Sequence, residues 1–374
     1  MGFKQSRLVI QLISQLHKFY KNKKVLVTGH NGFKGTWLTI WLKLMGAEIC
    51  GLSVEPPSRP NFYELSEIKQ NILSFHCDIR DLNSLKKIVT GCKPDIIIHM
   101  AAQSLVKESY NNPIETYSTN IMGTVNLLET VRSENNIRAV INVTSDKCYE
   151  NHEWIWGYRE CDPMGGFDPY SSSKGCSEII TSAYIRSFFN QDSANANRGT
   201  AVASARAGNV IGGGDFAADR LIPDMVRAFL KKEKVYLRNP QSTRPWQYVL
   251  EPLAGYLLLA MKLYEEGFKF SGGWNFGPEH SAVRNVGYVA DKFASMWGNA
   301  AGWITDGSLD KFHEANFLRM DCSKARSLLG WQAKLGVDQA LEWTVDWYKI
   351  FRDEPNQLLE FSEKQIMAYE NLLK

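Results

Sequence analysis

Apolar residues along this 374-residue chain fall into two patterns. Short, continuous apolar runs of strand length occur at 25–28, 48–54, 72–77, 95–100, 138–144 and 200–207. Longer segments with helical periodicity separate them, including one that ends at Leu44, one at 113–135 and one at 170–190. Continuous apolar strands that alternate with helices are typical of a parallel sheet covered by helices on both faces. The pattern therefore predicts an α/β fold built on a doubly wound parallel sheet.

The second half of the chain has shorter elements and more Gly and Pro, as in "GNVIGGGDF" (208–216) and "RNPQSTRPWQ" (238–247). This change predicts a smaller C-terminal α/β domain that binds substrate and covers the carboxyl edge of the sheet. The last helix pattern, 337–351, contains two Trp residues that we assign to core packing. The expected boundaries are 23–207 for a dinucleotide-binding domain with a return segment near 246–285, and 208–245 with 286–374 for the smaller domain.

The N-terminus begins with basic residues and a short apolar stretch, as a signal peptide does. Polar residues interrupt that stretch, however, and Leu8, Leu12, Ile13 and Leu16 suit one face of a helix. We therefore expect residues 1–22 to form an amphipathic helical extension. An extension without any role is the alternative.

Composition and charge exclude several function classes. Apolar residues make up 44% of the chain and charged residues 22%, as in ordinary globular proteins. A net charge of +3 is too small to indicate nucleic acid or an anionic membrane as a partner. The seven cysteines are scattered without a C-x-x-C pair, so we expect no metal site and no disulfide framework, as in a reducing cytoplasm. No apolar run reaches the roughly 18 residues that a membrane span needs.

A glycine-rich turn follows the first expected strand in "VLVTGHNGFKGTWL" (25–38). Gly29 would permit the tight turn, Gly32 would let the backbone approach a pyrophosphate, and Gly35 would let the helix pack on the strand. The helix N-terminus would face the negative charge. A plain glycine turn is the alternative, but the flanking strand and helix favour a Rossmann-type dinucleotide site. The other turn residues assigned to the cofactor are His30, whose bulk we expect near the phosphates, Asn31 and Phe33.

Strand ends further along the chain supply the other expected cofactor contacts. Ser53 stands where an acidic residue usually holds the ribose of NAD, and Glu55 and Arg59 follow it. An Arg could accommodate the 2′-phosphate of NADP, so we favour NAD without excluding NADP. Each remaining position could also be a plain strand-end loop. These positions are Asp78 and Ile79 at the adenine, and Ala101, Ala102 and Gln103 under the cofactor.

Three residues predict hydride chemistry at a secondary alcohol. Tyr170 and Lys174 are four residues apart on an expected helix and share one face. A cationic amine beside a phenol and a nicotinamide favours the phenolate, so we expect Lys174 and the cofactor to bring the pKa of Tyr170 towards the working pH and make it a base. Ser145 would bind the same hydroxyl. This set leaves Asp146 and Lys147 unexplained. An additional acid and base beside the three residues predict a second reaction step, the elimination of water. The alternative is that Asp146 and Lys147 are two solvated residues of a loop.

A family resemblance rests on five segments: "TGHNGFKGTWL", "TSDKCYEN", "GYRECDPMGGFDPYSSSKG", "RAGNVIGGGDFAADRLIPD" and "RPWQYVLEPLAGYL". Together they resemble the nucleotide-sugar 4,6-dehydratases of the extended short-chain dehydrogenase/reductase family, and the resemblance covers residues 23 to about 350. The dTDP-glucose members carry Thr-Asp-Glu where this chain has Ser145, Asp146 and Lys147. The Asp-Lys pair is similar to the CDP-D-glucose branch.

The resemblance implies an NAD-dependent lyase that converts CDP-D-glucose to CDP-4-keto-6-deoxy-D-glucose and water. Tyr170 would take the proton of the 4-hydroxyl while C4 gives a hydride to NAD. A base would then remove the C5 proton, and Asp146 would protonate the departing 6-hydroxyl before the hydride returns to C6. Lys147 stands where relatives have their C5 base, and we expect it to take that role when neutral.

The resemblance also implies substrate residues and an assembly. For Arg220 and Arg244, expected at the diphosphate, surface salt bridges are the alternative, and for Asn209 a strand cap is the alternative. Tyr248 stands where a His is expected in many relatives. A homodimer through helices 113–135 and 170–190 is implied, with a tetramer left open, although those helices could equally cover the sheet. The residues implied at the substrate are Asn209, Arg220 and Arg244 at the diphosphate, and Lys107 near the active site.

Two other functions remain open at this point. A nucleotide-sugar 4-epimerase would use the same Ser/Tyr/Lys set and NAD but would not need Asp146 and Lys147. A non-catalytic nicotinamide-binding regulator is disfavoured because such proteins typically lack the Tyr or the Lys. The preference for cytosine over other bases rests on the resemblance alone, as does a role in making a deoxysugar of a bacterial surface polysaccharide.

Overall fold

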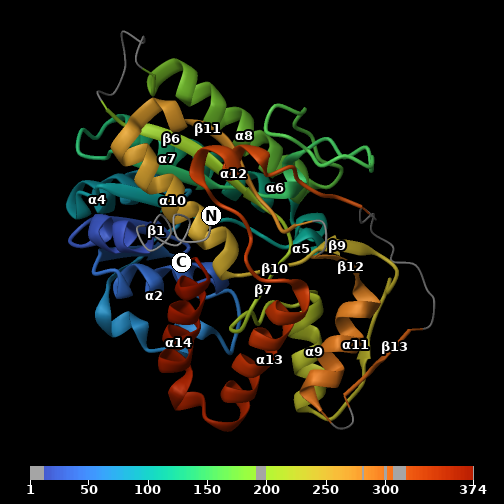
Figure 1. Cartoon of the computed structure of the whole chain (residues 1–374). Helices are drawn as coiled ribbons and strands as arrows, with labels where there is room; N and C mark the ends of the chain where they lie inside the picture. The colour runs from blue at the N-terminus through green and yellow to red at the C-terminus, as the bar shows by residue number, and fades with distance from the viewer. Residues whose placement is uncertain (1–11, 191–198, 280–281, 299–300, 306–316, 374) are drawn as a thin grey trace, which may run out of the picture.

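The computed structural model describes residues 12–190, 199–279, 282–298, 301–305 and 317–373. Seven parallel strands form its central sheet in the order β11-β6-β5-β4-β1-β2-β3 (Figure 1). This arrangement confirms the predicted fold class. Six of the strands follow the predicted apolar runs, and the seventh comes from the return segment near 246–285. The strands are β1 (Lys24–Thr28), β2 (Glu48–Ser53), β3 (Leu73–His76), β4 (Ile96–His99), β5 (Ala139–Val143), β6 (Ala201–Ala207) and β11 (Gly272–Phe276).

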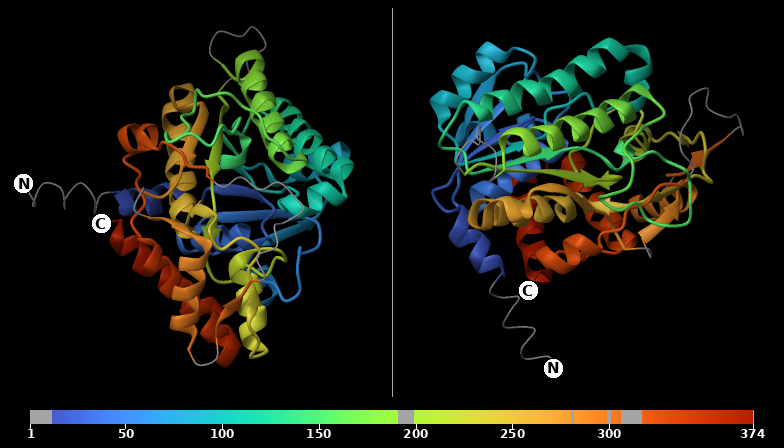
Figure 2. Two further views of the ribbon diagram at one scale, coloured as in Figure 1. Left: turned by 90° about the vertical axis from the view of Figure 1, so that its right-hand side faces the viewer. Right: turned by 90° about the horizontal axis from the view of Figure 1, so that it is seen from above.

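Alternate residues of the strands pack against two separate helical layers, because side chains alternate across a strand. Val25 and Val27 belong to the larger core, whereas Leu26 between them belongs to the core on the opposite face. Figure 2 shows helices on both sides of the sheet. The larger core contains side chains of α2 (Phe33–Leu44), α10 (Leu250–Glu266), α13 (Val337–Asp353) and α14 (Leu358–Leu372). The opposite core contains side chains of α4 (Leu82–Cys92), α7 (Gly123–Arg132) and α8 (Pro169–Phe188).

The expected helix at 113–135 is continuous but not uniform. It consists of α6 (Pro113–Tyr117), the π-helical turn η2 (Ser118–Met122) and α7. The helix α5 (Val106–Asn111) precedes it, and α3 (Phe62–Leu65) lies between β2 and β3. At the N-terminus, residues 12–20 are helical and bury Ile13 and Leu16; Leu8 lies outside the described residues.

The short elements of the second half gather beyond the carboxyl ends of the central strands (Figure 1). They pair as β7 (Val210–Ile211) with β10 (Gln247–Tyr248), β9 (Thr243–Pro245) with β12 (Val283–Asn285), and β8 (Val235–Tyr236) with β13 (Trp303–Ile304). The helices among them are α9 (Leu221–Leu230) and α11 (Val286–Trp297), whereas α12 (Ser323–Leu329) lies against β11 and α10.

The strand order reverses between β1 and β4, which are paired from Val25 with Ile96 to Thr28 with His99. In doubly wound sheets, ligands bind beyond the carboxyl ends of the strands at such a reversal. The glycine-rich turn follows β1, residues 100–103 follow β4, and Ser145 follows the neighbouring β5. The topology therefore brings three of the segments singled out in the sequence to one edge of the sheet.

Candidate active site

The three glycines of the turn differ in what surrounds them. Gly29 has φ +74, and a Cβ there would lie 2.7 Å from the backbone nitrogen of Ala101. A Cβ on Gly35 would lie 2.0 Å from the carbonyl oxygen of Gly29, so only glycine allows α2 to pack this closely on the turn. A Cβ on Gly32 would have no neighbour closer than 3.4 Å, and no side chain caps the N-terminus of α2 there. The uncapped helix N-terminus and the open face of Gly32 fit a bound pyrophosphate.

His30 turns into the protein instead of standing out of the turn. Its ring is buried and lies against Gly51 of β2, where a Cβ would meet the ring at 2.4 Å. Its Nδ1 pairs with the Ser53 hydroxyl at 2.8 Å, and its Nε2 pairs with Ser74 at 2.8 Å and with Tyr63 at 3.2 Å. Burial lowers the pKa of His30 to about 4, so the ring is neutral at physiological pH. The bulk that we expect at the phosphates is therefore held inside the fold.

The ends of β2 and β3 carry the residues expected at the ribose and adenine. Asn31 donates to the Val54 carbonyl at 2.6 Å and ties the turn to β2. The guanidinium of Arg80 donates to both carboxylate oxygens of Asp78, and these hydrogen bonds lower the pKa of Asp78. Ile79 is buried, and its side chain occupies the space where a Cβ on Gly123 would fall. Glu55 is exposed and pairs with His76 at 3.6 Å.

The segment after β4 is held by polar contacts on both sides. Thr28 pairs with His99 at 2.6 Å, and its hydroxyl also accepts the backbone N–H of Ala101 at 3.1 Å. The backbone N–H of Gln103 donates to Asn120 at 2.9 Å. These contacts fix residues 101–103 between the glycine-rich turn and the helical layer.

Ser145, Asp146 and Lys147 form the first turn after β5. Ser145 is the N-cap of the 3₁₀ helix η3 (Asp146–Cys148), and its hydroxyl accepts the backbone N–H of Lys147 at 3.2 Å. The same hydroxyl donates to Asp146 at 3.0 Å. Burial raises the pKa of Asp146, although Lys147 and Ser145 oppose the shift. Lys147 is half-buried and forms no ion pair with a carboxylate of the described residues.

Tyr170 and Lys174 lie in the first two turns of α8. The Asp168 side chain caps this helix by accepting the backbone N–H of Ser171 at 2.9 Å. Burial raises the pKa of Tyr170 to about 12, against a lowering by its hydrogen bond with Ser145. Burial lowers the pKa of Lys174 to about 8, and its ammonium donates to the Val143 carbonyl at 3.3 Å. In the chain alone, burial of the phenol outweighs the lowering by Ser145, and the expectation that Lys174 and a nicotinamide together favour the phenolate stays a prediction.

A buried ion pair beneath the catalytic loop was not expected from the sequence. Glu178, one turn beyond Lys174, accepts from Arg206 of β6 at 2.8 Å, and both side chains are about 5% exposed or less. The hydroxyls of Thr144 and Ser204 also donate to this carboxylate. The sequence does show a charged residue inside an apolar strand and another on the covered face of a helix. It does not show that the two form a pair, because they are 28 residues apart.

The residues implied at the substrate lie in different surroundings. Arg220 donates to Asp215 at 2.9 Å, and its charge lowers the pKa of Tyr170, so it lies near the catalytic set. Arg244 of β9 opposes the rise in the Asp146 pKa. Asn209 is half-buried and accepts the backbone N–H of Gln247 at 3.0 Å.

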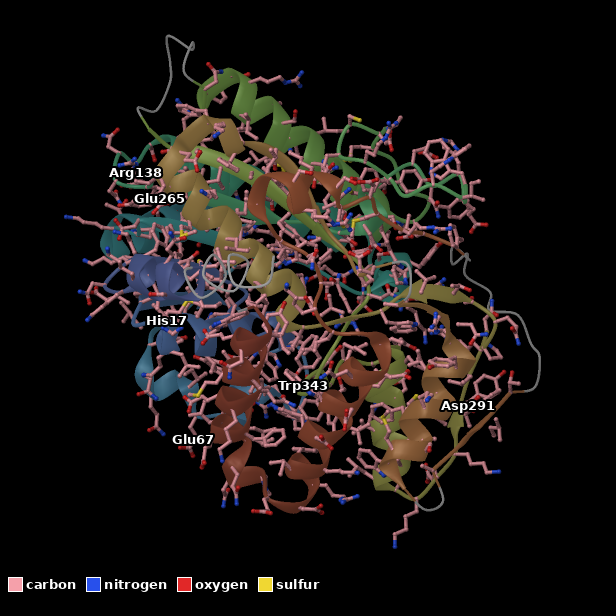
Figure 3. All side chains as sticks on the ribbon, in the orientation of Figure 1. His17, Glu67, Arg138, Glu265, Asp291 and Trp343 are labelled. Carbon is pink, nitrogen blue, oxygen red and sulfur yellow. The ribbon has the colours of Figure 1, made fainter. Side chains whose placement is uncertain are left out.

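Lys107 and Tyr248 lie in different surroundings. Lys107 is exposed and pairs with Asp219 at 2.9 Å. Tyr248 is buried in the larger core, donates to Gln365 at 2.8 Å and packs edge-on against Trp343 of α13, which is labelled in Figure 3. The exchange of His for Tyr at 248 is therefore accommodated by core packing.

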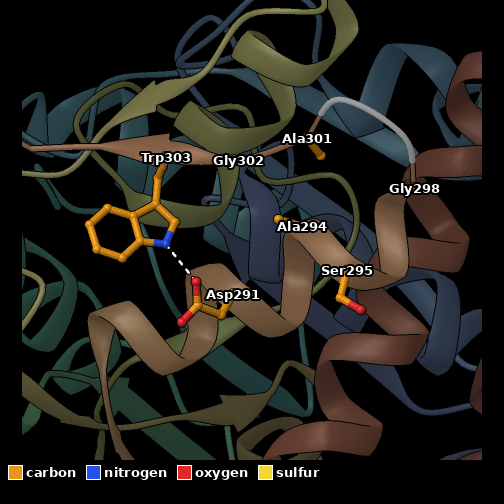
Figure 4. A pocket seen from close by; sticks show the side chains of 7 residues that line it. All are labelled: Asp291, Ala294, Ser295, Gly298, Ala301, Gly302 and Trp303. Carbon is orange, nitrogen blue, oxygen red and sulfur yellow. Dashed lines mark hydrogen bonds between the residues drawn. The ribbon is translucent and has the colours of Figure 1, made fainter.

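Other features of the described residues do not compete with this set. A hollow of about 630 Å³ on α11 and β13 is lined by Asp291 and Trp303, which hydrogen bond at 2.7 Å, and by none of the catalytic residues (Figure 4). Within the described ranges, no group of three or more His, Cys, Asp and Glu side chains is arranged to hold a metal ion. No helix in that part of the chain is long and apolar enough to cross a membrane.

Comparison with known proteins shows the family. The chain is 50% identical over 351 residues to the CDP-glucose 4,6-dehydratase of Salmonella typhimurium, which covers 94% of this chain and 97% of that protein. Among solved structures, the UDP-glucose 4-epimerase of Thermotoga maritima matches with a TM-score of 0.76 at 20% identity, covering 88% of this chain and 100% of the other. The dTDP-glucose 4,6-dehydratase of Bacillus anthracis, solved with NAD, matches with a TM-score of 0.71 at 22% identity, covering 89% and 98%. The profile of the family described as GDP-mannose 4,6 dehydratase matches residues 26–344, and the chain therefore belongs to that family of nucleotide-sugar dehydratases.

Proposed function

We propose that the chain is a CDP-D-glucose 4,6-dehydratase, a lyase that forms CDP-4-keto-6-deoxy-D-glucose and water. The observation that carries the proposal is Asp146, a buried carboxyl whose pKa burial raises above its ordinary value. It is hydrogen bonded to Ser145, which is in turn hydrogen bonded to Tyr170. A carboxyl with a raised pKa beside a Ser/Tyr/Lys set supports elimination in addition to hydride transfer. The 50% identical relative supports CDP-D-glucose as the substrate.

NAD is the proposed cofactor, and the turn around Gly32 and the uncapped start of α2 would hold its diphosphate. Bound NAD supplies a hydride acceptor for C4 of the sugar and a donor for C6. We favour NAD over NADP because the described structure has no basic side chain paired at Ser53, whose hydroxyl is engaged by His30. NADP stays open through Arg59.

We assign the following steps to the chain's own groups. Ser145 orients the 4-hydroxyl of the sugar, and Tyr170 takes its proton. The 4-ketone acidifies the C5–H bond, and Lys147 removes that proton in its neutral form. Asp146 then donates its proton to the leaving 6-hydroxyl, which departs as water, and Lys147 returns the proton to C5 when C6 receives the hydride. Arg220 and Arg244, which act electrostatically on Tyr170 and Asp146, would bind the diphosphate, with Asn209 beside them.

A test by mass separates this function from its nearest rival. The purified protein is incubated with NAD and, in separate reactions, with CDP-, dTDP-, UDP- and GDP-sugars. We expect CDP-glucose alone to lose the mass of one water molecule. Products of unchanged mass would favour a 4-epimerase, a function that the fold similarity at 20% identity equally permits. Loss of water from another sugar nucleotide would identify that nucleotide sugar as the substrate instead.

We also propose a homodimer formed by the helices at 113–135 and 170–190. Ile114, Met122 and Ile179 support it, because these large apolar side chains are exposed on α6, η2 and α8. Single subunits in sedimentation equilibrium would contradict this assembly, and a larger species would favour a tetramer.

The remaining assignments are proposals of the same kind. We propose a cytoplasmic enzyme that supplies a keto-deoxysugar nucleotide for deoxysugar and polysaccharide synthesis. We propose that residues 23–207 with the return near 246–285 hold the cofactor, that 208–245 and 286–374 hold the sugar nucleotide, and that 1–22 form a separate extension.

A further inference from the structure

The buried pair of Glu178 and Arg206 makes more contacts than an ion pair alone requires. Glu178 of α8 accepts from Arg206 of β6 at 2.8 Å, and both side chains are at most 5% exposed. A buried ion pair adds little net stability, and apolar residues of similar volume often hold two elements together as well or better. Stability alone therefore does not call for charge at these two positions, and the further contacts of the pair indicate what the charge does.

The carboxylate of Glu178 holds the start of the turn that carries the proposed acid and base. Thr144, which lies between β5 and Ser145, donates its hydroxyl to Glu178 Oε1 at 2.5 Å. The carbonyl before it, that of Val143, accepts from the Lys174 ammonium at 3.3 Å. Glu178 lies one helical turn beyond Lys174, and its charge raises the pKa of Lys174 against the effect of burial. Two residues on one face of α8 therefore fix the two residues that precede Ser145.

The guanidinium of Arg206 holds the other end of the same turn. Its Nη1 donates to the Tyr149 hydroxyl at 2.6 Å, and the guanidinium lies 5.0 Å from the centre of the Tyr149 ring. Tyr149 directly follows η3, is buried, and donates to Asn275 of β11 at 2.7 Å. Because η3 contains Asp146 and Lys147, the pair contacts the chain on both sides of these two residues.

We propose that Glu178 and Arg206 are positioning residues for the reaction, because together they fix both ends of the turn at 144–149 against α8. Their role in catalysis rests on the proposed function, in which groups of this turn and of α8 act on one sugar. The pair acts through Thr144 and Tyr149. Misplacement of reacting groups by about 1 Å can cost on the order of 10²-fold in rate. A firm support of this turn therefore affects kcat more than the binding of either ligand.

Variants that remove one contact each separate positioning from stability. Thr144→Val removes the hydroxyl at the start of the turn and keeps the shape of the side chain, whereas Tyr149→Phe removes the hydroxyl at its end. The matched control is Ser204→Ala, because Ser204 donates to the same carboxylate at 2.5 Å but lies within β6, outside the turn. Thr144→Ser keeps the hydroxyl and should restore the rate that Thr144→Val loses.

The first measurement is sugar-nucleotide turnover, at a temperature where circular dichroism shows that each variant is folded. We expect Thr144→Val and Tyr149→Phe to lower kcat on the order of tenfold, with unchanged KM for the sugar nucleotide and unchanged affinity for NAD. Ser204→Ala should leave kcat unchanged, although it takes a hydrogen bond from the same carboxylate. A merely structural role of the pair does not predict this difference between the variants.

The second measurement needs no substrate and is therefore independent of the proposed function. Hydrogen exchange of the backbone amides at 144–149, followed by mass spectrometry on the full-length protein, reports how firmly the turn is held. We expect faster exchange in Thr144→Val and Tyr149→Phe, and wild-type exchange there in Ser204→Ala. If the wild-type protein converts no sugar nucleotide, the dehydratase proposal fails, whereas the exchange still decides whether the pair fixes the turn.

Two outcomes would overturn the proposal. Equal losses of kcat with equally faster exchange in Thr144→Val, Tyr149→Phe and Ser204→Ala would show that the pair acts only through general stability. Unchanged kcat and unchanged exchange in both turn variants would show that the turn keeps its place without the pair.

Discussion

Neutralising Glu178 should destabilise the protein strongly, because this carboxylate compensates a buried guanidinium. Arg206 donates to it at 2.8 Å, and Thr144 just after β5 and Ser204 within β6 also donate to it. Glu178→Gln keeps the shape of the side chain and removes the charge, which leaves Arg206 buried without a counter-charge. Breaking a buried ion pair in this way costs about 3–5 kcal/mol of unfolding free energy.

Guanidinium denaturation followed by tryptophan fluorescence measures this cost. The matched control is Glu129→Gln, which breaks a pair with Arg132 at 2.6 Å that is 28–41% exposed. We expect a loss of about 1 kcal/mol or less there, since water screens such pairs. Replacing both Glu178 and Arg206 by Met should recover most of the stability, because an apolar pair of similar volume leaves no buried charge. A loss below about 1 kcal/mol for Glu178→Gln would refute the reasoning.

Three further predictions concern charge and proton transfer. Lys147→Met should spare hydride transfer and stop elimination, so reduced cofactor should accumulate at its absorbance band without a dehydrated product; an unimpaired variant would exclude Lys147 as the C5 base. Asp146→Asn should lower kcat by about 10²–10⁴-fold, since the amide cannot protonate the leaving hydroxyl, and a normal rate with unchanged circular dichroism would remove Asp146 from the chemistry. Burial raises the pKa of Glu251 to about 7 from 4.5, so between these values the native protein binds more protons than the unfolded chain and loses stability as pH rises. Glu251→Gln should abolish about 3 kcal/mol of that loss, and parallel stability curves for the two proteins from pH 4.5 to 7.5 would contradict it.

Most of the sheet could be predicted because its strands are buried on both faces and therefore read as continuous apolar runs. The run at 138–144 became β5, and Gly35 is confined to glycine by contacts with Gly29 and His30 within the same short turn, whereas Gly29 needs its positive φ and meets the backbone of Ala101. The strand β11 was hidden because "GGWNF" has neither a long apolar run nor strict alternation. The π-helical turn η2 was hidden for a related reason, since one extra residue per turn barely changes a helical pattern over so short a stretch. Beyond the last expected helix, α14 carries a regular apolar face that includes Leu358, Ile366 and Tyr369.

The candidate site could be predicted where its residues are close together in the sequence. It could not be predicted where burial sets the pKa of a group or where a partner lies on another element. Tyr170 and Lys174 share a helix face by spacing alone, and the Asp146 pair follows a strand end. The pKa of Tyr170 depends instead on how much protein surrounds the phenol, which no local pattern reports. The same holds for Glu178, whose partner lies on a different element.

Burial acts on the catalytic groups in one direction, towards their neutral forms. It raises the pKa of Asp146, raises that of Tyr170 to about 12, and lowers that of Lys174 to about 8. A neutral carboxyl suits an acid, but a neutral phenol is a poor base at physiological pH. The two ligands of the proposed reaction bring opposite charges to this set. A cationic ring beside Tyr170 would favour the phenolate, and an anionic diphosphate on Arg244 would offset part of the positive charge of Lys147 and Arg244 that lowers the pKa of Asp146. Each ligand would therefore move one group towards the form that its proposed step requires.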